Sequence, residues 1–309
     1  MNVQKLNFIF ISLLTCNLVG CSIKRIAVGQ MTGVVEDGIV AFETDSDLEL
    51  VEKSIPANIK LLEVMLASDP ENRKLLALLS RLYGSYAFGF IETQLEAISA
   101  KDEDDARIPY IKESLNRNYV KAQQYALRAI LISNPKCEEL LKIASKSKDC
   151  FASLGKSDVP AIYWYGFNVG SYINRNLSSV TALSKGHIVA AAMNRVNQLN
   201  EKYFHSGANL FLVAYYGSRS KMMGGDPDLA KKYYQRAKAI TGDDYWLADV
   251  FYARYPVVQK QDSKTFVSLL SKIKSSALPQ NSDQRFTMYN QVAKERAKIY
   301  LSQREDLID

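Results

Sequence analysis

The chain has 309 residues, 47% of them hydrophobic, and a formal net charge of +6. This hydrophobic content is ample for a large core, and 8 prolines and 15 glycines are few for the length, which disfavours an all-β fold. The basic residues are spread along the chain without a dense run, so the charge does not indicate a nucleic-acid-binding protein.

Residues 1–20 have the pattern of a bacterial signal peptide. Lys5 precedes an apolar stretch over residues 6–19, which is too short and too interrupted by polar residues to span a bilayer stably. Gly20 directly before Cys21 resembles the lipobox of bacterial lipoproteins, in which the signal is cut before the cysteine and its thiol carries lipid. The alternative is an ordinary signal peptide with a chance cysteine at the cleavage site.

The lipobox implies a lipid-anchored protein on the periplasmic side of the cell envelope, because several acyl chains together give stable attachment. Ser22 stands where an aspartate would mark inner-membrane retention in enteric bacteria, which favours the outer membrane. We interpret residues 21–44 as the lipidated cysteine and a tether. Gly29, Gly33 and Gly38 interrupt this segment and its apolar positions keep no sustained period, although part of it could pack as a short first helix.

From residue 45 the apolar positions follow a helical period to the end, which predicts one all-α domain over residues 45–309. A short helix over Leu48–Lys53 is followed by a second one, with Pro56 in its first turn, that ends at Asp69-Pro70. The charged run at residues 101–105 is interpreted as a solvated loop. Further helices are predicted over residues 71–98, 119–132, 137–144, 160–174, 185–203, 207–221, 227–241, 244–255, 264–275 and 284–302.

Some helices match the small and large positions of tetratricopeptide repeats. The matching residues are Leu76, Leu79, Ser80 and Tyr83 in a first helix, and Ala230, Tyr234, Ala237 and Gly242 in a second. The proline stops at Pro70 and Pro135 are not one repeat length apart, so the repeats are degenerate. We therefore predict a helical bundle or short superhelix of degenerate tetratricopeptide-type helix pairs with a concave side.

Two cysteines, Cys137 and Cys150, remain besides Cys21 in the mature chain. In an oxidising compartment they could form a disulfide that closes a short loop. Two free thiols are an equally weighted alternative, because spacing alone does not determine pairing.

Gly224-Gly225-Asp226-Pro227 could be mistaken for a phosphate-binding loop, but it lacks the Lys-Ser/Thr that such a loop needs. We interpret it as a structural turn in which the glycines give backbone freedom, Asp226 caps a helix and Pro227 occupies its first position.

Aromatic residues are the most suggestive binding feature, since amphipathic rings suit a groove for an organic ligand or a partner surface. The candidate groove residues are Tyr163, Trp164, Tyr165, Tyr172, Tyr215, Tyr216, Trp246 and Tyr252. For any single residue, ordinary core packing between helices is the competing interpretation. His187 and His205 have no metal-ligand spacing and no nucleophile motif is present, so we expect no catalysis, no metal and no cofactor.

From about Asp47 onward the chain contains distinctive blocks in a fixed order. They include Pro56–Leu66, Val159-Pro160-Ala161 with Trp164, Gly166 and Gly170, and Tyr252-Ala253-Arg254-Tyr255. The most specific block is Gly224-Gly225-Asp226-Pro227 with Ala230, Tyr234 and Ala237. In these blocks and their order the chain resembles the T-component lipoproteins of TRAP transporters.

The resemblance implies a bundle of cryptic tetratricopeptide-type repeats with a channel or groove and a trimeric assembly. It also implies a partner, the periplasmic solute-binding P-component, and a small organic or hydrophobic cargo. The alternative function is a general scaffold lipoprotein that holds envelope proteins on its concave surface.

Overall fold

The computed structural model describes residues 23–280 and 283–308 of the chain. The described residues form helices and no strand, which confirms the all-α prediction. The predicted signal peptide over residues 1–20 and the predicted lipid attachment site at Cys21 lie outside the described residues. None of the described helices is both long enough and apolar enough to cross a bilayer.

The segment interpreted as a tether is largely helical, over residues 23–38 and in α2, Val40–Glu43. Of residues 23–43, the buried ones are Val28, Thr32, Ile39 and Glu43. Successive members of this set are four, seven and four positions apart, so they mark one helical face. The three glycines did not break the helix, and a Cβ on any of them would have nothing within 4 Å.

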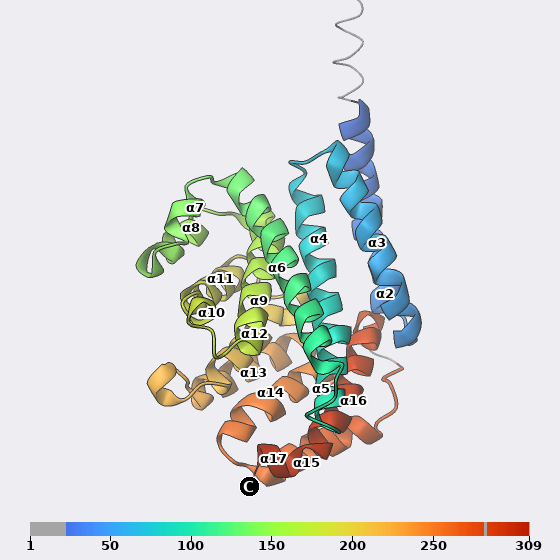
Figure 1. Ribbon diagram of the computed structural model, residues 1–309, viewed down its shortest axis with the longest axis vertical. Coiled ribbons are helices and arrows are strands. Elements are labelled where there is room, and N and C mark those ends of the chain that lie inside the picture. Colours follow the sequence, from blue (N-terminus) through green and yellow to red (C-terminus); the bar gives the residue numbers. More distant parts are fainter. Residues whose placement is uncertain (1–22, 281–282, 309) are drawn as a thin grey trace, which may run out of the picture.

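The helix α3, Leu48–Ser68, runs alongside this segment at the edge of the domain (Figure 1). The prediction of two helices in this range is wrong, because Pro56 lies inside one continuous helix. Its buried face passes through the proline without interruption, at Val51, Ile55, Ile59 and Leu62. Burial of that face outweighs the one backbone hydrogen bond that the proline removes.

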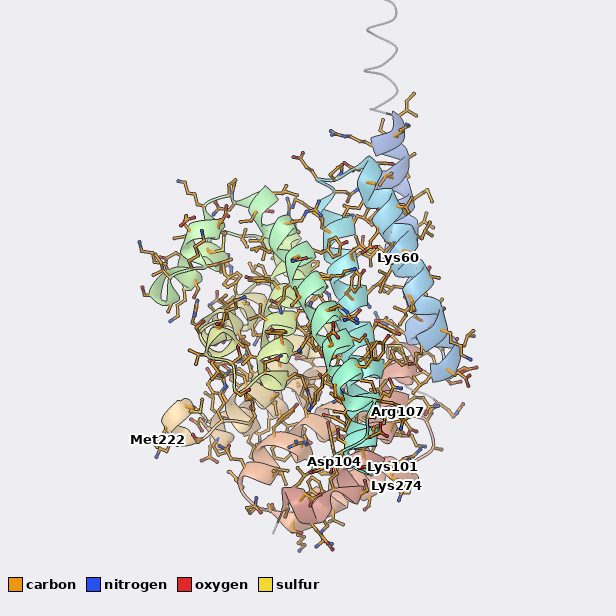
Figure 2. The ribbon with its side chains drawn as sticks, viewed as in Figure 1. Lys60, Lys101, Asp104, Arg107, Met222 and Lys274 are labelled. Atoms are coloured by element: carbon orange, nitrogen blue, oxygen red, sulfur yellow. A yellow bond between two sulfur atoms is a disulfide. The ribbon has the colours of Figure 1, made fainter. Side chains whose placement is uncertain are left out.

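Four helices pack side by side in the centre: α4, Arg73–Tyr86, α6, Ile108–Ser133, α9, Val159–Arg175, and α11, Gly186–Asn200. Small residues let them approach closely: Ser80 Oγ donates to the carbonyl oxygen of Ala122 at 2.8 Å, and a Cβ on Gly166 would lie 2.8 Å from that of Ala192. The helix α6 begins earlier than predicted, directly after the charged loop. Lys101, Asp104 and Arg107 mark the surface around that loop (Figure 2).

Shorter elements join these helices. A π-helical turn, Ala87–Glu92, links α4 to α5, Thr93–Ser99, and further helices are α7, Cys137–Leu140, α8, Ser147–Ala152, and α10, Val180–Leu183. Single 3-10 turns cover Ala144–Lys146, Lys156–Asp158, Lys221–Met223 and Gln284–Phe286. A disulfide joins Cys137 and Cys150, whose Cα atoms are 4.9 Å apart. Of the two alternatives, a disulfide or two free thiols, the structure has the disulfide.

The C-terminal part consists of α12, Tyr203–Gly217, α13, Pro227–Thr241, α14, Trp246–Tyr252, a π-helical turn, Ala253–Val257, α15, Ser263–Ser275, α16, Thr287–Ser302, and α17, Arg304–Leu307. The turn before α13 has Gly224 at φ +81° and Asp226 Oδ1 accepting from the backbone of Asp228 and Leu229. The helix α16 returns to contact α2 and α3, so the end of the domain closes onto its beginning.

Candidate ligand-binding cavity

A narrow apolar cavity of about 60 Å³ lies at the centre of the domain. Aromatic rings from the turn after α4, from α9, α12, α14 and α16 and from the residue before α14 form most of its wall: Phe88, Phe90, Tyr163, Trp164, Phe167, Phe204, Phe211, Tyr245, Phe251 and Tyr289. An apolar cavity of about 150 Å³ is known to hold benzene, so this central cavity is too small for an organic ligand until a side chain moves.

Glycines on two helices make room for the rings of this wall. A Cβ on Gly170 of α9 would lie 2.4 Å from Phe211 Cζ, and a Cβ on Gly207 of α12 would lie 2.5 Å from the Tyr163 hydroxyl oxygen. Both ring edges therefore occupy space that only glycine leaves free.

A second, polar cavity of about 380 Å³ lies beside the central one, between α4 and α9. Its wall includes the cations Arg73, Lys74 and Arg81 and the acids Glu36, Glu71 and Asp158. Trp164 lines both this outer cavity and the central cavity. The indole, whose residue is 1% exposed, is therefore part of the wall between them.

A third, small cavity of about 10 Å³ shares Phe88, Phe167, Phe211 and Phe251 with the central cavity, shares no lining residue with the outer one, and also contacts Glu92 and Arg175. The three cavities thus follow one another through the domain, from a polar outer one, through an aromatic centre, to a charged inner end.

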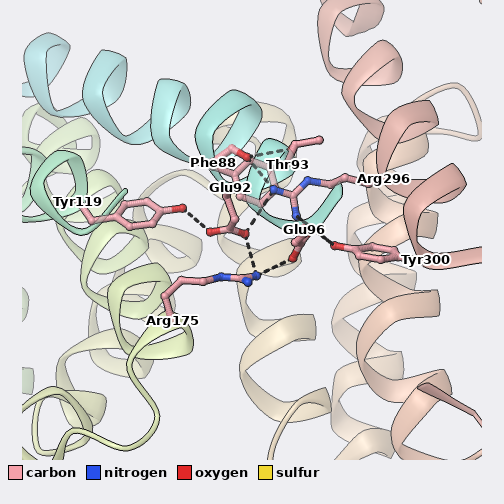
Figure 3. A network of polar contacts seen from close by, with 8 residues as sticks. All are labelled: Phe88, Glu92, Thr93, Glu96, Tyr119, Arg175, Arg296 and Tyr300. Atoms are coloured by element: carbon pink, nitrogen blue, oxygen red, sulfur yellow. Dashed lines mark hydrogen bonds and ion pairs between the residues drawn. The ribbon is translucent and has the colours of Figure 1, made fainter. Parts of the chain in front are cut away.

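A buried network of two carboxylates and two guanidinium groups closes the inner end (Figure 3). Arg175 Nη2 donates to Glu92 at 3.1 Å and to Glu96 at 2.6 Å, and Arg296 lies 3.3 Å from a carboxylate oxygen of each. Burial raises the pKa of Glu96, but Arg296 and Arg175 outweigh it and hold that pKa below its ordinary value. The Glu96 carboxylate is therefore kept ionised within the core.

The hydroxyls of two tyrosines complete the network: Tyr119 donates to Glu92 at 2.7 Å and Tyr300 to Glu96 at 3.0 Å. Arg296 also donates to the carbonyl oxygen of Phe88 at 2.6 Å, at the rim of the aromatic wall. The network therefore fixes the position of a cavity-lining turn.

Three consecutive residues at the start of α12 have left-handed backbone angles: Phe204 at φ +48°, His205 at +55° and Ser206 at +59°. Non-glycine residues there cost roughly 1–2 kcal/mol each, so this turn is strained. Ser206 Oγ accepts from Asn209 Nδ2 at 2.9 Å, and Asn209 in turn bonds Asn197 and Glu201. These buried bonds hold the turn in its strained form.

The strained turn directs Phe204 into the aromatic wall. Its ring centroid lies 4.8 Å from that of Trp164, 5.4 Å from Tyr163 and 5.6 Å from Tyr289. The Arg81 guanidinium, from the outer cavity, lies 5.2 Å from the Phe204 ring centroid. Phe204 therefore stands between a cation of the outer cavity and the rings of the central one.

Glu43, at the end of α2, binds the groups around this ring. Its Oε1 accepts from Arg81 Nη2 at 2.5 Å and from the Tyr289 hydroxyl at 2.9 Å, and His205 Nε2 lies 3.8 Å away. Burial raises the pKa of Glu43, but His205, Arg81 and Tyr289 together lower it below its ordinary value. The N-terminal segment is thus connected to the strained turn through a buried carboxylate.

Of the eight aromatic residues proposed for a groove, the structure brings Tyr163 and Trp164 together at the central cavity. Tyr165 and Trp246 are buried elsewhere in the core, and Tyr172 is half-buried. The remaining three form separate ring contacts: Tyr215 and Tyr216 meet at 5.1 Å, and Tyr252 stacks on Tyr234 at 4.3 Å.

Sequence reasoning missed Phe204, Phe211, Tyr245 and Tyr289 as lining residues. They come from α12, from α16 and from the residue directly before α14, and no local pattern shows that these elements converge. Gly170 and Gly207 are local signals of this packing, because a glycine within an apolar helix often marks a close contact.

Comparison with known proteins adds two findings. The family model described as "TRAP transporter T-component" matches residues 44–308. An uncharacterized protein of Treponema pallidum (strain Nichols) is 23% identical over 245 residues, which cover 74% of each chain.

Proposed function

The chain belongs to the TRAP transporter T-component family, and from this premise we propose that it docks the periplasmic solute-binding P-component and relays a small organic or hydrophobic ligand through its central cavity. The aromatic cavity is the observation that supports this proposal. Its wall is almost wholly apolar, and it lies between a polar outer cavity and a charged inner end. Apolar walls with a few polar groups are typical of sites for organic molecules.

The proposal includes the location of the protein. Cleavage before Cys21 and its lipidation would attach the domain to the periplasmic side of the envelope, with the outer membrane favoured. The helical segment over residues 23–43 would then follow the anchor directly. A homotrimer and tetratricopeptide-type pairing of the helices are further parts of the proposal, the latter supported by the side-by-side packing of α4, α6, α9 and α11.

A general scaffold would use a charged concave surface around a closed core, whereas an enzyme would need reactive polar groups converging in a pocket. The aromatic character of the central cavity favours ligand relay over both. In this role the chain is a transport accessory protein and not an enzyme.

Docking is tested by sedimentation of a soluble form that begins after Cys21, mixed with the solute-binding protein encoded beside it. We expect a complex of defined mass at tens of micromolar or below. The matched control is the same mixture with a solute-binding protein from an unrelated transporter. Absence of a complex, with and without candidate solutes, would contradict the docking role.

A further inference from the structure

The central and outer cavities are separate and share one lining residue, Trp164. The Phe204 ring lines the central cavity, and its centroid lies 4.8 Å from that of Trp164 and 5.2 Å from the guanidinium of Arg81, which lines the outer cavity. The central cavity is smaller than an organic ligand requires. If the central cavity receives a ligand from the outer side, at least one of these rings has to move.

Of the two rings, Phe204 is the one whose displacement is favoured by its backbone. Trp164 belongs to the regular helix α9 and is 1% exposed. Phe204 is the first of three left-handed residues, and their backbone strain is relieved when they leave that conformation. Strained backbone persists only where surrounding contacts enforce it, so the contacts of this turn determine whether it stays closed.

One of those contacts comes from a weakly attached segment. Glu43 holds Arg81 and Tyr289, which both contact the Phe204 ring, and lies next to His205 within the turn. Yet only four of residues 23–43 are buried, and apart from the contacts of Glu43 itself the ion pairs of the segment, Arg25–Asp69 and Lys74–Glu36, are long, at 3.8 and 3.6 Å. A segment with so few buried contacts is released at a lower free energy than the core helices.

We propose that Phe204–Ser206 is a strained gate between the outer and central cavities, latched shut by Glu43 of the N-terminal segment. This inference rests on the proposed function and specifies how the relay site is regulated. Displacement of residues 23–43 withdraws Glu43, frees Arg81 and Tyr289, and lets the turn relax so that Phe204 leaves the boundary. The segment that would follow the lipid anchor thereby controls access to the cavity.

The test measures how fast an apolar quencher reaches Trp164. Trp246→Phe leaves Trp164 as the only tryptophan, and bromooctanol quenches it on contact during rapid mixing. In this background Glu43→Gln should raise the association rate about tenfold and leave the dissociation rate nearly unchanged, because the charged hydrogen-bonded latch holds only the closed, ligand-free form, so the affinity rises by the same factor. Glu49→Gln, an exposed acid on the neighbouring helix α3, is the matched control and should change neither rate.

A double-mutant cycle separates a latch from a general loosening of the fold. Phe204→Ala should speed entry by itself, and Glu43→Gln should then add nothing, because the latch acts through that ring. Tyr289→Phe, which removes one hydrogen bond from Glu43 with little change in shape, gives a smaller increase and replaces Glu43→Gln if that variant does not fold.

Three results would overturn the gate. Unchanged rates in the Glu43→Gln and Tyr289→Phe variants would show that Glu43 is not a latch. An equal effect of Glu43→Gln with and without the Phe204 ring would show that Phe204 is not the gate. Absence of quenching in every variant, including Phe204→Ala, would instead reject the cavity as a ligand site and the gate with it. Binding without any sensitivity to Glu43 would reject the gate alone and leave the proposed function standing.

Discussion

The ring of Tyr163 packs directly on the backbone of Gly207, where a Cβ would come within 2.5 Å of the tyrosine hydroxyl oxygen and 2.8 Å of Cζ. This contact joins α9 to α12 immediately after the strained turn and sets the distance between two walls of the central cavity. Any larger residue at position 207 must displace the Tyr163 ring.

Gly207→Ala should therefore lower the free energy of unfolding by about 1–3 kcal/mol, the usual effect of overpacking a core. Denaturant titration followed by circular dichroism measures the change. Tyr163→Phe in the same chain should restore part of the loss, since it removes the atom nearest to the added Cβ. The control Gly29→Ala, where nothing lies within 4 Å, should be neutral or stabilising; an equal loss in both alanine variants would exclude the steric explanation.

Arg296 is a second position with a large expected effect. It is 1% exposed and pairs with Glu92 and Glu96, so Arg296→Met removes one of the two guanidinium groups that form ion pairs with these buried carboxylates. Breaking a buried ion pair in this way typically costs about 3–5 kcal/mol, and we expect a loss in that range. Arg107→Gln removes an exposed pair with Asp105 and should change stability by less than about 0.5 kcal/mol. A similar small effect at Arg296 would mean that the network contributes little to the fold.

The pH dependence of stability follows from Glu63. Burial raises the pKa of its carboxyl, but hydrogen bonds from Lys60, Tyr83 and Tyr125 outweigh it and lower that pKa from 4.5 to about 2. A lowered folded-state pKa gives stability that is fully present above pH 4.5 and is lost as the pH falls toward 2.

Between neutral pH and pH 3 the wild type should therefore lose more stability than Glu63→Gln, by about 1 kcal/mol after allowance for solvent screening of this partly exposed group. Denaturant titrations across this range measure the difference. Parallel curves for the two proteins would show that Glu63 has the same pKa in the folded and unfolded states.

The local pattern of the sequence determined much of the fold. The helix α13 begins and ends where predicted, because Asp226 and Pro227 mark its start and Gly242 its end. Residues 21–44 were interpreted as a tether of which a part could pack as a short first helix, because three glycines obscure its single narrow apolar face; the segment is instead helical throughout residues 23–38. Tertiary packing also overrode the proline signal at Pro56.

The site was less predictable, for two physical reasons. Its walls come from helices distant in sequence, so Tyr163 and Trp164 could be proposed from α9 but Tyr289 could not be assigned to the same cavity. The left-handed turn consists of three residues that are not glycine, Phe204, His205 and Ser206. Its backbone conformation is therefore enforced by contacts with Asn209 and Glu43 and not by local preference.

The most direct test of the central claim, that the aromatic cavity is the ligand site, is a crystal structure of the soluble protein grown with bromooctanol. Anomalous scattering locates the bromine without reference to a docking model. We predict a bromine position among the rings of Trp164, Phe211 and Tyr289, with the Phe204 ring displaced from its contact with Trp164. Bromine found only at the protein surface or confined to the outer cavity, with Phe204 unmoved, would contradict the account.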